Sequence, residues 1–362
     1  MEKILSVELN SKLKIECWTY YKLSIIQTLP NYMNWLSSHI NIYAGEMGEG
    51  VYFGTSKPHP PSYYSDILSI EEIDLYNTDV NEIVDKIKIE INNDCYYVLF
   101  LRNENGFSHE ALIYGYSDKH SVFYTISMNE NNQFSSHEIS YTELINGYRN
   151  DYNYYIDNPE QYYHRHDFGY VMSRIKPIMT YANKNYAEEY FGKICFETYG
   201  TRTDICDCFE FNSFSKTCSY YTGIACLIYI YEKILKIFNN DAVSEDDLIV
   251  IKKNMFKLYE HRQLNLDALI WYETQWNITD TVILNARQQY AEACVEMHTI
   301  CMLFLKYTVT REDNLLKYIT KKIINQYTVE KSILISYILK IREWFTSNVL
   351  KNRLIEGGIT QA

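Results

Sequence analysis

The stretch Ile15-Glu16-Cys17-Trp18-Thr19-Tyr20-Tyr21-Lys22-Leu23-Ser24-Ile25-Ile26 organises the first half of the chain. Its apolar residues repeat at helical spacing from Trp18 to Leu29, until Pro30 ends the pattern, so we predict a helix that begins at Cys17. Unpaired amides and the positive end of the helix dipole lower the pKa of a thiol at such a position, which favours the nucleophilic thiolate. The alternative interpretation is a core cysteine, the usual role of a lone thiol on an apolar helix.

The length and composition of the chain predict two domains. It has 362 residues, of which 47% are hydrophobic, enough for a large core. The pattern is mixed in the first half and helical beyond residue 220, where no glycine falls between Gly223 and Gly357. We therefore predict an α+β fold with a first domain over 1–150, an irregular connecting region over 151–219 and a helical domain over 220–362.

Alternating and periodic segments predict the elements of the first domain. We expect strands at Tyr96–Arg102, His109–Tyr116 and Ser121–Ser127, with the last two joined as a hairpin in an antiparallel sheet. The region 81–91 predicts an amphipathic helix, and Ser140 is expected to cap another helix at its start.

The second half predicts helices, which we expect at Tyr220–Asn239, Ser244–Arg262, Leu266–Gln275, Thr281–Tyr307, Arg311–Gln326 and Thr328–Leu350. Before them, Lys193–Thr198 reads as a strand-like piece.

Charge and cysteine usage exclude several classes of protein. The net charge of -12 disfavours a nucleic-acid-binding protein, which needs a basic face. No run of about 18 apolar residues predicts a membrane span. Nine cysteines, an odd number, together with an N-terminus that lacks an apolar signal core, predict a cytoplasmic, reducing environment. Two metal-like clusters, His164-Arg165-His166 and Cys206-Asp207-Cys208 with Cys218, lack standard zinc spacing, so we predict no metal.

His109 is the candidate base for a cysteine nucleophile. It follows the loop at Gly106 and stands at the entrance of a predicted strand, from which its imidazole can face a cleft. A cysteine nucleophile needs such a base to take its proton, and acyl chemistry also needs donors around the developing oxyanion. A cysteine that starts a helix, followed later by a histidine that heads a hairpin strand, is the chain order of papain-like enzymes.

Three motifs strengthen that resemblance: Leu23-Ser24-Ile25, His109 with Leu112-Ile113-Tyr114-Gly115-Tyr116, and Ile139-Ser140-Tyr141-Thr142-Glu143-Leu144. Over roughly residues 10–150, the chain resembles papain-like cysteine families related to double-glycine leader peptidases. It more closely resembles butirosin-H-like proteins of nonribosomal biosynthetic clusters, among them closthioamide-type pathways. The resemblance implies a papain-like domain with Cys17 as nucleophile and His109 as base.

The third catalytic residue has two candidates. Counting across a turn centred on Asp118 and Lys119 sets His109 opposite Met128, so Ser127 and Asn129 are the nearest polar residues. By resemblance Ser127 takes the position of the family's acid, whereas Asn129 is closer to the amide of papain itself. For the oxyanion, related peptidases carry a glutamine where this chain has Ser11, and Asn10 is the neighbouring amide.

The resemblance implies an acyltransferase that forms an amide bond. It would take an acyl group from the phosphopantetheine thioester of a carrier protein, hold it on Cys17 and deliver it to a small amine, with no bound cofactor. Two other classes stay open: a papain-like peptidase or amidase, in which water attacks the thioester, and a noncatalytic binding protein that keeps the fold.

Overall fold

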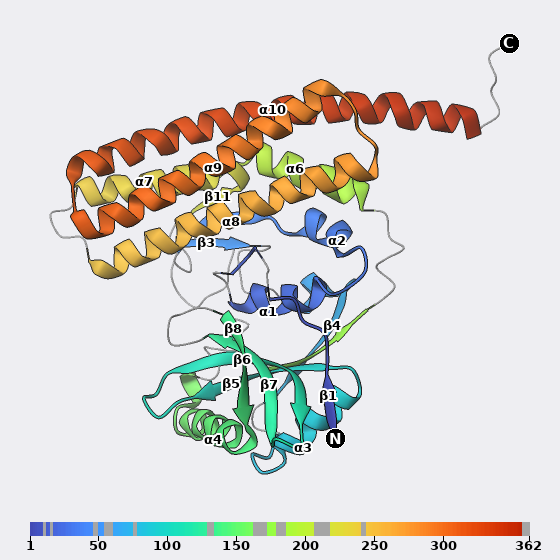
Figure 1. Ribbon diagram of the computed structural model, residues 1–362. Coiled ribbons are helices and arrows are strands. Elements are labelled where there is room, and N and C mark those ends of the chain that lie inside the picture. Colours follow the sequence, from blue (N-terminus) through green and yellow to red (C-terminus); the bar gives the residue numbers. More distant parts are fainter. Residues whose placement is uncertain are drawn as a thin grey trace. The chain divides into compact units, whose positions relative to one another are not determined.

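The computed structural model describes residues 1–9, 12–14, 17–45, 50–53, 61–74, 78–128, 134–161, 172–178, 186–205, 218–239 and 244–356. The fold is α+β, with an antiparallel sheet in the N-terminal half and a helical C-terminal half, as predicted (Figure 1). The chain divides into two compact units. Met1–Trp35 and Lys57–Asn185 form the first, and Leu36–Ser56 and Tyr186–Ala362 form the second.

The first unit is built on an antiparallel sheet. Within the described ranges this sheet has seven strands, six of them in the order β4-β9-β5-β6-β7-β8, with β1 paired to the end of β6. The strands are β1 (Glu2–Ile4), β4 (Leu68–Ile73), β5 (Tyr96–Arg102), β6 (Ser108–Ser117), β7 (Val122–Met128), β8 (Phe134–Ser140) and β9 (Met172–Pro177). The three predicted strands correspond to β5, β6 and β7, so that prediction is confirmed.

Two helices, α3 (Ile83–Asn92) and α4 (Tyr141–Asp157), pack against this sheet and close its main core. The predicted apolar stripe of α3 is confirmed, because its isoleucines at 83, 87 and 91 are fully buried. Helix α4 begins after Ser140, whose side chain accepts the amide of Glu143 while the Glu143 carboxylate accepts the amide of Ser140. This reciprocal capping box confirms the predicted start of the helix.

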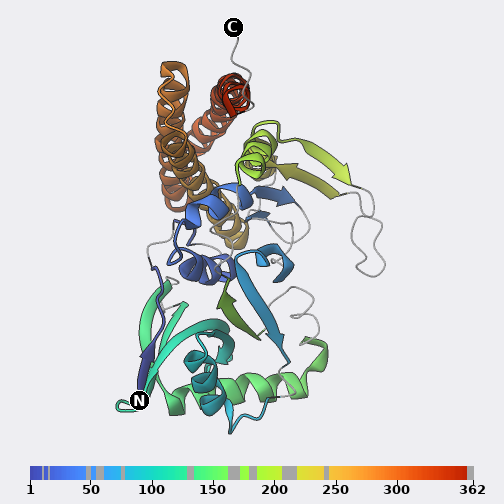
Figure 2. The same ribbon diagram turned by 90° about the vertical axis from the view of Figure 1, so that its right-hand side faces the viewer.

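Helix α1 (Cys17–Ile26) begins at Cys17, as the sequence predicts. Figures 1 and 2 show it on the opposite side of the sheet from α4. It is followed by α2 (Tyr32–His39). Because the apolar residues of α1 from Tyr20 onward are nearly all buried, the helix is fixed in the first unit along its length.

A β-bulge shifts the pairing of β6 with β7. Ser117 pairs with Val122 and Gly115 with Tyr124, but beyond the irregularity Ala111 pairs with Ser127. The count that sets His109 opposite Met128 is therefore wrong, because it assumes a tighter turn and no inserted residue. Gly115 is required here, since a Cβ atom at this position would lie 2.8 Å from the carbonyl oxygen of Lys3.

The second unit combines a small sheet with long helices. Its four-stranded sheet has the order β10-β11-β2-β3. The helices α8, α9 and α10 pack in sequence, and α10 also contacts α6 and α7. The elements are β2 (Ile42–Gly45), β3 (Gly50–Phe53), α6 (Ala187–Thr198), β10 (Arg202–Ile205), β11 (Cys218–Thr222), α7 (Cys226–Asn239), α8 (Glu245–Gln275), α9 (Thr281–Thr310) and α10 (Asp313–Glu356). Short 3-10 helices lie at Pro61–Tyr64 in the first unit and Gly223–Ala225 in the second.

Several predicted boundaries in this half are wrong. The strand expected at Lys193–Thr198 is the end of α6, because Tyr190, Ile194 and Glu197 are buried at helical spacing. The helix expected from Tyr220 begins at Cys226, since Tyr220 belongs to β11. The helices predicted at Ser244–Arg262 and Leu266–Gln275 form one continuous helix, α8. Those predicted at Arg311–Gln326 and Thr328–Leu350 form one continuous helix, α10.

Candidate functional site

Cys17 is the first residue of α1. The structure describes its main chain but not its side chain. The first turn of α1 contains no acidic residue, so no neighbouring carboxylate in that turn opposes the helix dipole. Helical spacing places position 17 on the same face as Tyr20 and Tyr21. The surroundings of these two tyrosines therefore indicate which part of the sheet the start of α1 faces.

Tyr20 and Tyr21 connect α1 to the strands that carry the other candidate residues. The Tyr21 hydroxyl donates to the carbonyl oxygen of Glu110 over 2.6 Å. Tyr20 stacks on Phe134 of β8 with ring centroids 4.6 Å apart, and Tyr21 meets the same ring edge-on at 5.5 Å. Both tyrosines are buried, so the first two turns of α1 are held at the beginning of β6.

His109 is the second residue of β6 and is half-buried. Its Nδ1 lies 3.0 Å from the carbonyl oxygen of Glu110, and its ring lies 6.2 Å from that of Phe134 and stacks on Phe107 at 5.9 Å. If Nδ1 carries the proton and donates it to that carbonyl, Nε2 is left as the basic atom. Phe134 thus contacts both His109 and the two tyrosines of α1.

The structure describes one of the two candidates for the third catalytic residue. Ser127 pairs with Ala111, so it shares a sheet face with that residue, and its hydroxyl lies 3.2 Å from Nε2 of His137 on β8. That contact engages Ser127 with a different imidazole from His109. Asn129, the alternative, and Asn10, the predicted oxyanion donor, lie outside the described residues.

The loop that leads into His109 is fixed by a buried carboxylate that the sequence analysis missed. Asp151 of α4 is fully buried, accepts the hydroxyl of Ser108 over 2.6 Å and lies 3.4 Å from the guanidinium of Arg102. Arg102 also donates to the carbonyl oxygen of Gly106 over 2.6 Å. Nothing local in the sequence signals this cluster, because Asp151 is distant in the chain from its partners.

Glu110 is a second missed residue. Its side chain is 6% exposed, and its buried Oε2 atom has no hydrogen-bond partner. A buried carboxylate oxygen without a hydrogen-bond partner is costly, and such a group in a native structure calls for an explanation. The signal was present in the sequence, because the alternation of β6 sets Glu110 on the same face as the buried residues Leu112 and Tyr114.

Most other described thiols are poor competitors for Cys17. Burial raises the pKa of Cys95, Cys195 and Cys226, and raises that of Cys301 to about 12. A raised pKa disfavours the thiolate, which is the reactive form. Cys206 and Cys208 lie outside the described residues, as do His164 and His166, and so does the side chain of Cys218.

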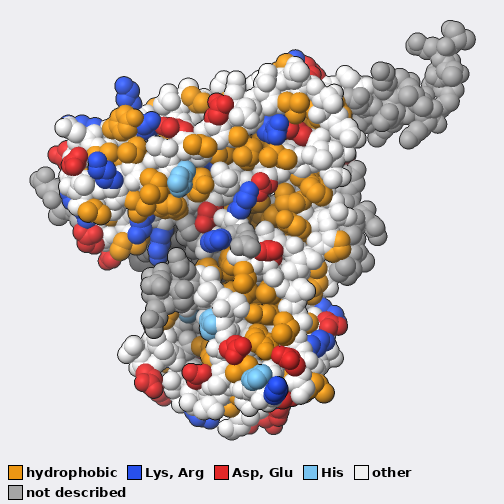
Figure 3. All heavy atoms as spheres, in the orientation of Figure 1, with side chains coloured by type: hydrophobic (Ala, Val, Ile, Leu, Met, Phe, Trp, Pro, Cys, Tyr) orange, Lys and Arg blue, Asp and Glu red, His pale blue; other side chains and the backbone are white. Residues whose placement is uncertain are grey.

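No metal site is found in the described ranges. No group of three or more His, Cys, Asp or Glu residues there could hold a metal ion. None of the helices described is long and apolar enough to cross a membrane. On the face that Figure 3 shows, basic and acidic side chains are interspersed. Lys322 and Lys340 of α10 are in ion pairs with Glu296 and Glu343.

Comparison with known proteins assigns no family to this geometry. No family model matches the chain, and no curated protein matches it.

Proposed function

We propose that the chain is a papain-like cysteine acyltransferase that forms an amide bond from a carrier-bound thioester and a small amine in nonribosomal biosynthesis. The observation that supports it best is the connection between the two candidate catalytic segments. Tyr21 binds the carbonyl oxygen of Glu110, the residue after His109, and Phe134 packs against His109, Tyr20 and Tyr21. The start of α1 and the beginning of β6 are thereby held together within one unit.

The proposed reaction has two transfers. His109 takes the proton of the Cys17 thiol, and the thiolate attacks the carbonyl carbon of the carrier thioester. The phosphopantetheine thiol leaves with a proton and acyl-Cys17 remains. The amine then attacks this thioester, its proton passes through His109 to the Cys17 sulfur, and the amide is released. Unpaired amides at the start of α1 are suited to stabilise the oxyanion in both steps.

The choice between an acyltransferase and a peptidase depends on what reaches acyl-Cys17. Water gives hydrolysis, whereas an amine in a sheltered site gives an amide. We favour amide formation on the resemblance to butirosin-H-like proteins. The feature that favours a noncatalytic binding protein is a missing aspartate. By resemblance Ser127 takes the position of that acid, and its hydroxyl contacts His137, so no carboxylate is assigned to orient His109.

An acyl-transfer assay with matched cysteine variants tests the proposal. The protein is incubated with an acyl-phosphopantetheinyl carrier protein, and its intact mass is measured before and after addition of an amine. We expect one acyl adduct on the wild type and none on Cys17→Ala. Cys95→Ala, which removes a buried thiol of the same unit, should keep the adduct.

Each class of protein gives a different result in this assay. Acyl-Cys17 that disappears only when an amine is added, with release of the amide, supports the acyltransferase. Rapid loss of the adduct to water, with cleavage of peptides in the absence of an amine, indicates a peptidase. Absence of any adduct, together with full product formation by Cys17→Ala in a coupled assay, contradicts the proposal.

A further inference from the structure

One main-chain oxygen atom connects the candidate base to α1. The carbonyl oxygen of Glu110 lies 3.0 Å from Nδ1 of His109 and accepts the hydroxyl of Tyr21 over 2.6 Å. A carbonyl oxygen has two lone pairs, so it can accept both hydrogen bonds at once. Tyr21 is buried, and hydrogen bonds away from water are electrostatically stronger and reinforce one another. The orientation of the imidazole is therefore coupled to a side chain of the helix that begins at Cys17.

The tautomer of His109 decides whether this residue can act as a base. In a neutral imidazole, Nε2 can take the proton of the thiol only when Nδ1 carries the ring hydrogen. In triad enzymes a carboxylate accepts that hydrogen and holds the ring in this tautomer. Within the described part of the chain, the side chain of His109 forms one hydrogen bond, which joins Nδ1 to the Glu110 carbonyl. That carbonyl is therefore placed to select the basic tautomer.

The main chain on the other side of His109 is held as well. Ser108 donates its hydroxyl over 2.6 Å to the carboxylate of Asp151, which is fully buried on α4. His109 thus stands between two residues that are fixed by different helices, Ser108 by α4 and Glu110 by α1. With both neighbours fixed, the position of the Glu110 carbonyl relative to the ring depends on few free torsions. The Tyr21 hydroxyl then determines where that oxygen points.

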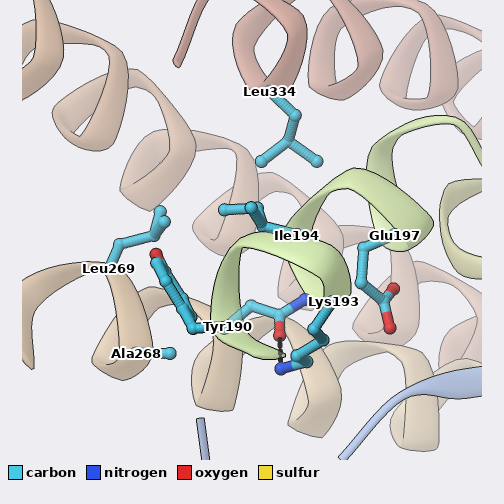
Figure 4. A pocket seen from close by; sticks show the side chains of 8 residues that line it. Tyr190, Lys193, Ile194, Glu197, Ala268, Leu269 and Leu334 are labelled. Atoms are coloured by element: carbon cyan, nitrogen blue, oxygen red, sulfur yellow. Dashed lines mark hydrogen bonds between the residues drawn. The ribbon is translucent and has the colours of Figure 1, made fainter. Parts of the chain in front are cut away.

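The pocket between α6, α8 and α10 in the second unit offers no alternative site for the proposed substrates (Figure 4). Its walls are largely apolar, and it has room for about one water molecule. Neither an acyl group nor an amine fits in a space of that size. The contacts that bear on the proposed chemistry are those around His109 in the first unit.

We propose that Tyr21 is a positioning residue for His109 and that it acts through the main-chain carbonyl of Glu110. This role rests on the proposed function, in which His109 takes the proton of the Cys17 thiol. The Tyr21 hydroxyl orients and polarises the carbonyl, the carbonyl accepts the hydrogen of Nδ1, and Nε2 is left to take the thiol proton. Tyr21 itself keeps its proton and does not contact the reacting atoms.

Matched tyrosine variants test this role. Tyr20 is the control, because it is also buried on α1, stacks on Phe134 and donates its hydroxyl to a main-chain carbonyl, that of Leu9, over 2.9 Å. We expect Tyr21→Phe to slow single-turnover acylation of Cys17 by a carrier thioester at least about fivefold, with the same half-saturating concentration of carrier. Tyr20→Phe should slow it less than about twofold, because its hydroxyl is not bound to the Glu110 carbonyl.

The tautomer of His109 can be measured by NMR, without acyl transfer. In protein labelled with ¹⁵N-histidine, long-range ¹H–¹⁵N spectra distinguish the two neutral tautomers, and a His109→Gln variant identifies the signals of this ring. At a pH at which the imidazole is neutral, we expect the Nδ1–H tautomer in the wild type and in Tyr20→Phe. Tyr21→Phe should show a mixture of both tautomers, which a merely structural loss of a hydroxyl would not produce.

The NMR result decides the proposal. An Nε2–H tautomer in the wild type would overturn it, and this measurement holds even if Tyr21→Phe does not fold. The same tautomer in folded Tyr21→Phe and Tyr20→Phe would also overturn it, whatever the rates, and so would a changed tautomer with an unchanged rate of acylation. If the wild type forms no acyl-Cys17, the acyltransferase proposal fails, while the tautomers still show whether Tyr21 orients His109.

Discussion

At the residue scale, the orientation of His109 is the central question for the proposed chemistry. The neighbouring residues hold its ring between Phe107 and Phe134, with Nδ1 beside the carbonyl oxygen of Glu110. In papain-like enzymes a side chain also fixes the imidazole, and removal of such a group can cost several orders of magnitude in rate. Ser127 and Asn129 are the two candidates for that role.

The described pairing of β6 with β7 ends at Ala111 and Ser127. Asn129 lies outside the described residues, but in the sequence it follows Ser127 by two positions, as His109 precedes Ala111 by two. We therefore expect Asn129→Ala to lower the rate of Cys17 acylation by about tenfold or more, and Ser127→Ala to lower it by less than about threefold. Single-turnover acylation with a carrier thioester measures both rates. The opposite ranking would assign the role to Ser127 and show that its contact with His137 is broken in the active state.

Residue-level prediction succeeded where the cause was local and failed where it was not. The position of Cys17 at a helix start follows from the apolar period that Pro30 ends. The count that set His109 opposite Met128 failed because the connection after Ser117 is longer than the assumed turn and because the pairing shifts between Ile113 and Gly115. The same part of β6 also pairs with β1, whose backbone leaves no room for a side chain at Gly115. A register count from one hairpin cannot include that third strand.

At the element scale, the start of α4 is encoded by its capping residues. The capping box of Ser140 and Glu143 satisfies an otherwise unpaired amide in the first turn and the amide of the cap itself. Leu144 and Tyr148, which follow on the same helix, are fully buried in the main core of the first unit. The stability of α4 therefore contributes to the sheet that carries His109.

Removal of the cap tests this contribution. We expect Ser140→Ala to lower the free energy of unfolding by about 1 kcal/mol, because the amide of Glu143 loses its acceptor. Urea unfolding followed by circular dichroism measures the change. The matched control is Thr142→Ala in the same exposed first turn, which should change the stability by less than about 0.5 kcal/mol. Equal effects of the two substitutions would contradict the role of the cap.

Elements were predictable where apolar residues repeat without interruption. The strands β5 to β7 and the helix α3 have such patterns, and their predicted and observed ranges agree closely. For α8 and for α10 the sequence predicted two helices instead of one, because buried polar residues interrupt the apolar stripe of each helix. Arg262 donates to Glu330 over 2.7 Å, and Gln326 donates to the same carboxylate over 2.6 Å. These residues stand at or near the predicted breaks, so a buried ion pair between helices was mistaken for two helix ends.

At the scale of the whole molecule, the second unit buries an unusual set of titratable groups. Burial lowers the pKa of Lys193 to about 8, lowers that of His261, and raises that of Glu273 to about 7. None of these shifts is visible in the sequence, because each depends on which helices cover the residue. They make the stability of this unit depend on pH, and the dependence has a different sign for each group.

The contribution of Glu273 to the pH dependence of stability is the easiest to isolate. The side chain of Glu273 is 5% exposed, its Oε1 atom has no hydrogen-bond partner, and Arg287 lies 3.0 Å from Oε2. Desolvation outweighs the attraction of Arg287 and raises the pKa from 4.5 to about 7. The folded state therefore keeps a proton that the unfolded state loses between these values. Stability falls as pH rises through this window and levels off above it.

The substitution Glu273→Gln removes this proton equilibrium and leaves every other ionisable side chain in place. We expect the unfolding free energy of Glu273→Gln, relative to wild type, to rise by roughly 3 kcal/mol between pH 4.5 and pH 7.5. Urea titrations at several pH values measure the difference. His261 acts in the opposite direction, since its lowered pKa costs stability as pH falls below 6.5, but it is common to both proteins and cancels. The exposed substitution Glu312→Gln should show no such trend. A difference that stays constant with pH would mean that Glu273 remains ionised in the folded state and that Arg287 compensates its burial.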